Sequence, residues 1–173
     1  NGAEDSPNEM GYDFFSGQIS GVLPDFFAWT KITNGVSFEV TEYATTETVN
    51  DAIGWLESVT GPWFLWLAFN APHSPYHVPP QGLYSQALAQ GAECTGKRLG
   101  RCFRASIEAL DAELSRLLDA IGDPDFANTY VIFIGDNGTA GKVLQGYAQG
   151  HGKDSLYQGG IHVPLFIAGP GVV

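Results

Sequence analysis

The stretch Tyr130-Val-Ile-Phe-Ile-Gly-Asp-Asn-Gly138 decides the fold class that this sequence predicts. It is an apolar run that ends in a glycine, a carboxylate and an amide, and a second apolar run lies at Val163-Pro-Leu-Phe-Ile167. Short apolar runs that are bounded by turn residues are typical of buried strands. We therefore predict strands over residues 129–135 and 163–168.

Two helices and one further strand are predicted upstream of these runs. The run over 63–69 is apolar at every position, which is typical of a central strand covered on both faces. A helix capped by Thr45 or Thr46 is predicted before it, and Gly61-Pro62 ends that helix. Its apolar face comprises Val49, Ile53, Leu56 and Trp55.

An amphipathic helix is predicted over 103–121, because its apolar residues recur on one stripe. The stripe consists of Phe103, Ile107, Leu110, Leu114, Leu117, Leu118 and Ile121. The acidic residues of this helix are expected on its solvated face.

The alternation of helices and apolar strands predicts an α/β fold with a mostly parallel sheet. Residues 1–40 show no sustained period and are predicted as a loop-rich segment, whereas 41–173 form the α/β part. At 173 residues the chain is long enough for one domain with its own core. We therefore expect a single domain over 1–173.

The charge of the chain excludes two classes of partner. A formal net charge of -11 argues against nucleic acid, which requires a basic patch, and against an anionic membrane surface. The sequence also has no apolar stretch long enough to span a bilayer. An anionic substrate could still bind where a metal and a few cations concentrate positive charge.

Cys94 and Cys102 are the two cysteines of the chain. They could close a small disulfide loop in an oxidising compartment, or both could be free thiols. Their spacing is not that of a zinc or redox motif.

Asp136 and Asn137 are the candidate metal ligands. A carboxylate and an amide supply the oxygen ligands that Ca²⁺ and Mg²⁺ prefer, and flanking glycines permit the turn that brings both to one ion. The alternative is an ordinary Asp-Asn-Gly turn.

Lys153 and His73 are the candidate catalytic and substrate-binding residues. Lys153 follows a glycine, and its ammonium could neutralise substrate oxygens in the transition state. His73 lies between Pro72 and Pro75, and a fixed imidazole there could protonate a leaving alkoxide. The alternatives are an exposed loop lysine and a histidine bonded to the loop backbone. The His73 and Asp136 loops both follow predicted strands, so they can share one edge of the sheet.

The remaining polar candidates are expected to be structural. His77, His151 and His162 are predicted to pack or to bond the backbone. Ser74 and Ser155 are not in a Gly-x-Ser-x-Gly motif, which disfavours a serine nucleophile.

Taken together, these motifs resemble the sulfatase family of the alkaline phosphatase superfamily. The matching stretches are Phe64-Leu-Trp-Leu-Ala-Phe-Asn-Ala-Pro-His-Ser-Pro75, Ile107-Glu-Ala-Leu-Asp111, Val131-Ile-Phe-Ile-Gly-Asp-Asn-Gly138, Gly152-Lys153, Leu156-Tyr-Gln-Gly-Gly160, Val163-Pro-Leu165 and Gly169-Pro-Gly171. The segment Gly11-Tyr-Asp-Phe-Phe-Ser-Gly17 is similar to one that precedes the substrate loops in that family. The resemblance covers nearly the whole chain in the family's order.

The resemblance implies a three-layer α/β sandwich around a large mixed sheet, of which this chain would form part. It implies that Asp136 and Asn137 bind Ca²⁺, with Mg²⁺ as the alternative, and that Lys153 contacts the sulfate group. His73 would contact the sulfate and assist departure of the leaving group. The substrate would be a sulfate ester of an aryl alcohol or a carbohydrate.

The family's nucleophile is a formylglycine that is made within a Cys/Ser-x-Pro-x-Arg motif. No such motif occurs here, because Cys94 precedes Thr-Gly-Lys-Arg and Cys102 precedes Phe-Arg-Ala-Ser. The family's first pair of metal-binding aspartates is also missing, and Ca²⁺ takes about six to eight oxygens. We therefore expect an internal fragment of a sulfuric ester hydrolase that is inactive by itself, with the nucleophile upstream of Asn1.

Two other functions stay open at this point: a phosphodiesterase or phosphonate monoester hydrolase of the same superfamily, and a non-catalytic sulfatase-like fragment. An exposed sheet edge and apolar surface predict self-association. The resemblance implies that the parent protein is periplasmic or extracellular.

Overall fold

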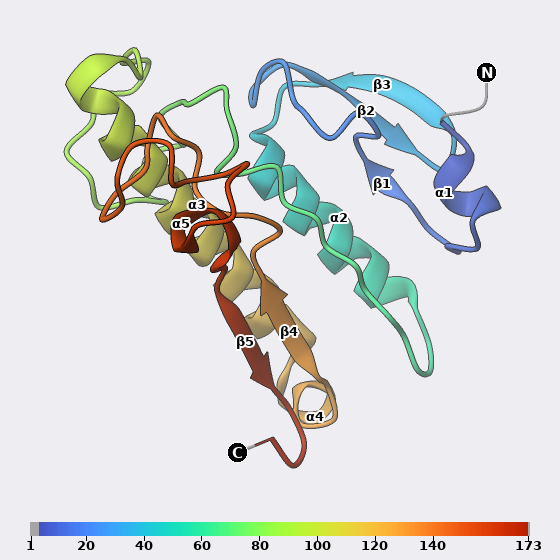
Figure 1. Ribbon diagram of the computed structural model, residues 1–173. Coiled ribbons are helices and arrows are strands. Elements are labelled where there is room, and N and C mark those ends of the chain that lie inside the picture. The colour runs from blue at the N-terminus through green and yellow to red at the C-terminus, as the bar shows by residue number, and fades with distance from the viewer. Residues whose placement is uncertain (1–3, 173) are drawn as a thin grey trace. The chain divides into compact units, whose positions relative to one another are not determined.

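The computed structural model describes residues 4–172, which form two compact units divided after Ala120 (Figure 1). Each unit is described by itself. The first contains α1 (Ser6–Glu9), β1 (Ser16–Gly17), β2 (Trp29–Thr33), β3 (Val36–Val40), α2 (Ala44–Ser58), the 3-10 helix η1 (Gly96–Arg98) and α3 (Leu99–Ile121), which ends at the boundary. The second contains α4 (Asp123–Phe126), β4 (Val131–Ile134), α5 (Gln158–Ile161) and β5 (Leu165–Ala168).

The segment over 1–40 that was predicted to be loop-rich contains a short helix and three strands among its described residues. Strands β1, β2 and β3 form an antiparallel sheet in that order, beside α2 (Figure 1). The hairpin between β2 and β3 turns at Asn34 and Gly35, which have φ values of 45° and 79°. Asn-Gly is the preferred dipeptide for such a two-residue turn, so the sequence contained a signal for this hairpin.

A buried ion network joins β2 to α2. Lys31, which is 5% exposed, donates hydrogen bonds to Glu47 and to both oxygens of Asp51 at 2.9 and 3.1 Å. Ser16 Oγ donates to Asp51 at 2.7 Å. Burial by itself lowers the pKa of Lys31, but the hydrogen bonds and charges of Glu47 and Asp51 more than offset it, so the pKa is raised. A buried lysine is tolerated here because it is paired.

The core of the first unit lies between α2, α3 and the segment 63–69. Val49, Ala52 and Leu117 are its buried centre, and Ile53, Leu56, Leu65, Leu67 and Phe69 pack against them. This confirms Val49, Ile53 and Leu56 of the apolar face that was predicted for α2. The predicted threonine cap is wrong, because Tyr43 occupies the N-cap position without a side-chain hydrogen bond.

Helix α3 is longer than the predicted helix, and its buried face is partly different. The buried residues are Cys102, Ala105, Ser106, Ala109, Leu110, Glu113 and Leu117. Ile107 of the predicted stripe is 43% exposed. The prediction from hydrophobicity alone therefore misplaced part of the buried face of α3, because small residues and one carboxylate occupy much of that face.

The prediction that all acidic residues of α3 are solvated is wrong for Glu113, which is 3% exposed. Its carboxylate accepts from Thr46 Oγ1 at 2.6 Å and from Arg116 Nε at 2.8 Å. Arg116 also donates to the backbone oxygen of Thr46 at 3.2 Å and to Asn50 at 2.9 Å. The network ties α2 to α3 and satisfies the buried charge.

The central strand that was predicted over 63–69 is not present: these residues are all described by the structure, and they form no strand. Its side chains alternate, since Leu65, Leu67 and Phe69 pack on the core whereas Phe64 and Trp66 are each 69% exposed. The segment is therefore covered on one face only. A strand requires a paired neighbour, and residues 4–172 supply none for it.

Strands β4 and β5 confirm the two predicted apolar strands with narrower bounds. They lie side by side in the second unit (Figure 1) and pair antiparallel, with Val131 opposite Ala168 and Ile134 opposite Leu165. The prediction of mostly parallel pairing is wrong for the described residues, whose ladders are all antiparallel. Parallel neighbours need a long crossover, usually a helix, but the only helix between β4 and β5 is the four-residue α5.

Cys94 and Cys102 form a disulfide, which decides between the two predicted states. Cys102 lies at 0% exposure in the first turns of α3. The bond therefore attaches the segment before η1 to a buried face of α3. None of the helices within 4–172 has the length and apolarity needed to cross a bilayer.

Candidate functional site

The Asp136–Asn137 turn directly follows β4 and is held on both sides by hydrogen bonds. The N–H of Gly135 donates to Pro164 O at 3.0 Å, and the N–H of Gly138 donates to Gly160 O at 3.0 Å. Asp136 is exposed between these two bonds, and Asn137 is half-buried. The chain therefore turns at once after the strand, as a shared ligand site for the two side chains requires.

Glycines allow the backbones to come this close. A Cβ on Gly138 would overlap the carbonyl oxygen of Gly159, and a Cβ on Gly160 would overlap that of Ser155. A Cβ on Gly152 would overlap the carbonyl oxygen of Thr139. The Gly-rich sequence of this loop is thus explained by close backbone approach.

Lys153 is fixed beside the Asp136–Asn137 turn by its backbone. Its N–H donates to Thr139 O at 2.8 Å, and the N–H of Thr139 donates to Gly159 O at 3.2 Å. Thr139 lies two positions after Asn137. The structure therefore brings Asp136, Asn137 and Lys153 into one loop cluster.

The side chains of these three residues form no hydrogen bond or ion pair within residues 4–172. Lys153 is half-buried. Two acceptor groups and one cation are thus available to ligands next to a rigid backbone, an arrangement that suits a metal ion together with an anion.

The donor chemistry fits a hard cation, but only in part. Asp136 supplies a carboxylate and Asn137 an amide oxygen, and both oxygen types are ligands of Ca²⁺ and Mg²⁺. No group of three or more His, Cys, Asp or Glu residues that could hold a metal occurs in the described part of the chain. Asp136 and Asn137 could therefore hold a hard cation only together with further oxygen donors.

His73 is exposed on the loop that follows the segment 63–69. Its backbone N–H donates to Asn70 O at 2.9 Å, and its Nδ1 lies 2.8 Å from Ser74 O. A carbonyl oxygen only accepts, so Nδ1 carries the proton in the neutral ring and Nε2 is left free for another group. The convergence of His73 with Lys153 stays a prediction, since the two residues belong to different units.

His77 has the contacts that the predicted structural role requires. Pro75 O accepts from its Nδ1 at 2.9 Å, and Tyr43 Oη lies 3.0 Å from its Nε2. Burial lowers the pKa of His77, although the bond to Pro75 and the charge of Asp25 act in the opposite direction. Burial therefore favours the neutral form of the ring.

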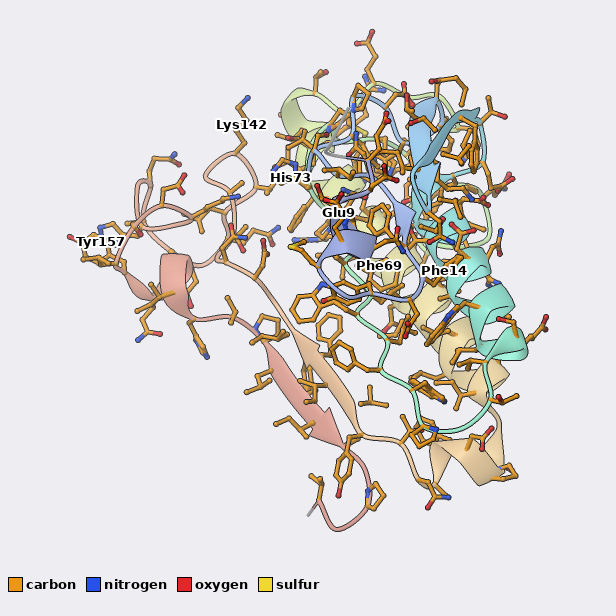
Figure 2. All side chains as sticks on the ribbon, turned by 90° about the vertical axis from the view of Figure 1, so that its right-hand side faces the viewer. Glu9, Phe14, Phe69, His73, Lys142 and Tyr157 are labelled. Carbon is orange, nitrogen blue, oxygen red and sulfur yellow. A yellow bond between two sulfur atoms is a disulfide. The ribbon has the colours of Figure 1, made fainter. Side chains whose placement is uncertain are left out.

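The remaining histidines and serines occupy the second unit or the His73 loop. His151 stacks on Tyr157 with ring centroids 3.6 Å apart, a contact that sequence reasoning missed. Ser155 Oγ donates to Gly152 O at 2.7 Å and so braces the Lys153 loop, whereas Ser74 lies 3.4 Å from the ring of His73. His162 is exposed. Figure 2 shows Lys142 and Tyr157 at separate places on the loop between β4 and α5.

Comparison with known families gives one match over nearly the whole chain. A family model described as Sulfatase matches residues 4–173. The "Uncharacterized sulfatase YdeN" of Escherichia coli (strain K12) is 26% identical over 167 residues, which cover 93% of this chain and 29% of that protein. A "Sulfatase" of Formosa agariphila is 28% identical over 141 residues, which cover 74% of this chain and 25% of that protein.

Two solved structures share the fold. "Ps i-CgsB" and "Ps i-CgsB in complex with k-i-k-neocarrahexaose" give TM-scores of 0.75 and 0.76 at 22% and 23% identity. Each comparison covers 95% of this chain and 41% of the other. The chain thus spans less than a third of its curated relatives and less than half of these structures.

Proposed function

The chain belongs to the sulfatase family, and from this premise we propose that it is part of a sulfuric ester hydrolase whose anion site contains Lys153, Asp136 and Asn137. The observation that carries the proposal is the backbone bond from Lys153 to Thr139, which joins the lysine to the Asp136–Asn137 turn. The three side chains have no partner within residues 4–172 and are available to a ligand.

Lys153 binds the sulfate group in this proposal. Lys153 is half-buried, and its backbone is bonded beside the turn that contains the exposed Asp136, in a chain with a net charge of -11. A sulfate would be repelled by such a chain unless local positive charge is concentrated at the site. Lys153 therefore supplies a cation where negative charge develops on the sulfate oxygens in the transition state.

Asp136 and Asn137 would hold a calcium ion, with magnesium as the alternative. When bound, the ion polarises the sulfate oxygens and neutralises their charge. Asp136 and Asn137 contribute a minority of the roughly six to eight oxygens that Ca²⁺ takes, so the other ligands come from elsewhere in the protein. The close bonds at Gly135 and Gly138 hold the two ligands in place.

His73 would protonate the leaving oxygen through Nε2. The bond from Nδ1–H to Ser74 O leaves Nε2 as the nitrogen that can carry the second proton. In the imidazolium form, Nε2–H donates to the departing alkoxide, which lowers the barrier to S–O cleavage.

The nucleophile is proposed to lie outside this chain. Cys94 and Cys102 are bonded to each other, and neither begins a Cys/Ser-x-Pro-x-Arg motif, so neither is a source of formylglycine. We accordingly expect the chain by itself to be inactive, and activity to belong to a longer protein that contains it.

The three-layer sandwich is proposed for that longer protein. The alternating exposure of 63–69, together with exposed side chains of β4 and β5 such as Ile132 at 64% and Phe166 at 66%, supports the addition of neighbouring layers and strands. In the chain alone, the same surfaces are proposed to mediate self-association. Analytical ultracentrifugation that finds only monomer at high concentration would contradict self-association.

A sulfated carbohydrate is the proposed substrate class, and the periplasm or the extracellular space is the proposed location. Support for the substrate comes from a structural relative that is described in complex with k-i-k-neocarrahexaose, a carrageenan oligosaccharide. Support for the location comes from the disulfide, since disulfides persist in oxidising compartments.

The test is sulfate release by a longer protein that contains this chain. Carrageenan oligosaccharides and an aryl sulfate are the substrates, and the matching aryl phosphate tests the phosphoryl hydrolase alternative. We expect Ca²⁺-dependent sulfate release that Lys153→Ala reduces and Lys142→Ala, at an exposed position of the same loop, leaves unchanged. Preferential release of phosphate, or no turnover of any ester, would overturn the proposal.

A further inference from the structure

His77 is bonded through both ring nitrogens. Nδ1–H donates to Pro75 O at 2.9 Å, and Tyr43 O–H donates to Nε2 at 3.0 Å. Because Pro75 O can only accept, the protonated nitrogen is Nδ1 and the acceptor is Nε2. One tautomer and one ring orientation are therefore selected.

Two of the aromatic rings around His77 are buried in the first unit. Phe26 stacks on the imidazole at a centroid distance of 4.0 Å, and Phe27 meets it edge-on at 5.8 Å. Phe26 and Tyr43 are 1% and 2% exposed. Tyr43 caps the start of α2, and the N–H of Ala44 donates to Phe26 O at 2.9 Å. His77 is thereby attached to the N-terminus of a long helix.

The loop that contains His73 has few other attachments. Ala71 and Val78 at its ends are buried, whereas His73, Ser74 and Pro75 between them are exposed. Two successive carbonyl groups link the two histidines, since Ser74 O accepts from His73 and Pro75 O accepts from His77. An imidazole that fixes the Pro75 carbonyl therefore also restricts the Ser74 carbonyl, to which His73 is bonded.

We propose that His77 is a positioning residue for His73: it holds the loop so that the His73 ring keeps its proton on Nδ1 and leaves Nε2 free. The proposal rests on the role assigned to His73 above. It gives a half-buried histidine of the first unit a task beyond packing, because the tautomer of an exposed ring depends on it.

The test is the tautomer of His73 in the chain itself, read from the ring ¹⁵N shifts at a pH well above the ordinary histidine pKa of about 6.5. His77→Phe keeps an aromatic ring but removes both hydrogen bonds. His77→Gln keeps a donor and an acceptor and is the conservative rescue. Tyr43→Phe removes only the hydroxyl that bonds Nε2. His162→Gln, at an exposed histidine, is the matched control.

We expect the His73 shifts to move from the Nδ1–H pattern toward those of a free, exchanging imidazole in His77→Phe. A smaller shift in the same direction is expected in Tyr43→Phe, and none in His77→Gln or His162→Gln. If His77→Phe does not fold, the His73 ring shifts of Tyr43→Phe are compared with those of His77→Gln, and this comparison decides whether His77 positions His73. Unchanged His73 shifts in every folded variant would overturn the positioning role. Since no turnover is measured, that result would leave the sulfatase proposal standing.

Discussion

The backbone N–H of Lys153 donates to the carbonyl oxygen of Thr139 across 2.8 Å. This bond joins two loops that the sequence separates, one with the ammonium and one with the Asp136–Asn137 turn. The main chain therefore sets the position of the Lys153 backbone relative to the turn, and no side-chain substitution at Lys153 removes this bond. Variants at this position should test charge without disturbing the loop.

Replacement of Lys153 by alanine is expected to lower kcat/KM for sulfate esters about 10²-fold or more in a longer protein that contains the chain, the size associated with losing one preorganised oxyanion donor. Lys142→Ala is the control, because Lys142 is an exposed lysine of the same loop. Equal kinetics for the two variants, measured as sulfate release, would rule out a role for Lys153 in the transition state.

Replacement of Gly152 by alanine is expected to destabilise the second unit by about 1–3 kcal/mol, the usual cost of inserting a methyl group where none fits. The new Cβ would overlap Thr139 O and lie 3.2 Å from Leu144 Cδ1. Gly141→Ala is the control, since its Cβ would meet only Gln149 Nε2 at 3.5 Å. Hydrogen exchange at the Lys153 amide measures the effect. Equal protection in both variants would contradict the close packing of this loop.

Replacement of Glu113 by glutamine is expected to lower the free energy of unfolding by about 1–3 kcal/mol, because the buried bonds to Thr46 and Arg116 are weakened or lost. Asp111→Asn, at an exposed position of the same helix, is expected to change it by less than about 0.5 kcal/mol. Urea unfolding monitored by circular dichroism compares the two variants. An unchanged free energy of unfolding in Glu113→Gln would show that the network does not stabilise the packing of α2 on α3.

Stability is expected to fall in mild acid through His77. Burial lowers its folded-state pKa below the ordinary value of about 6.5, so between the two values the unfolded chain binds more protons. The stabilisation is therefore complete above about pH 6.5 and is lost as the pH falls through the folded-state pKa. Urea unfolding at several pH values should show the free energy of unfolding falling as the pH falls, with the same slope in the wild type and in His162→Gln. The same slope in His77→Gln would assign it to another group.

Removal of the disulfide is expected to lower the free energy of unfolding by about 2 kcal/mol, the loop-entropy value for a short closed loop. The bond joins residues eight positions apart. Thermal unfolding of the wild type with and without a reductant, and of the Cys94→Ala/Cys102→Ala double variant, measures the effect. An unchanged melting temperature in the reduced wild type would show that the bond does not stabilise the fold.

Local patterns were enough to predict several elements and failed for others. The apolar runs at β4 and β5 were found because a strand and its turn residues are adjacent in the sequence. The run 63–69 is similarly apolar but forms no strand, because a ladder depends on a partner that composition does not reveal. The hairpin at Asn34-Gly35 was missed although its dipeptide is a strong turn signal.

Burial of charge was the least predictable property. Lys31 and Glu113 are charged residues in amphipathic elements, yet both lie inside the first unit. Lys31 is paired with Glu47 and Asp51, and Glu113 accepts from Thr46 across a gap of 67 positions. A pattern along one element cannot show a partner on another, and for this reason Glu113 was predicted on the solvated face of its helix.

The sequence by itself determined the kinds of residue at the candidate site, the approximate location of α2, α3, β4 and β5, and membership of the sulfatase family. Tertiary structure alone decided the antiparallel pairing of β4 with β5, the bonding of Cys94 to Cys102 and the approach of Lys153 to the Asp136–Asn137 turn. The physical reason is that propensity and periodicity are properties of neighbouring residues. Strand pairing, disulfide formation and close backbone contact at glycine instead depend on segments that meet only when the chain is folded.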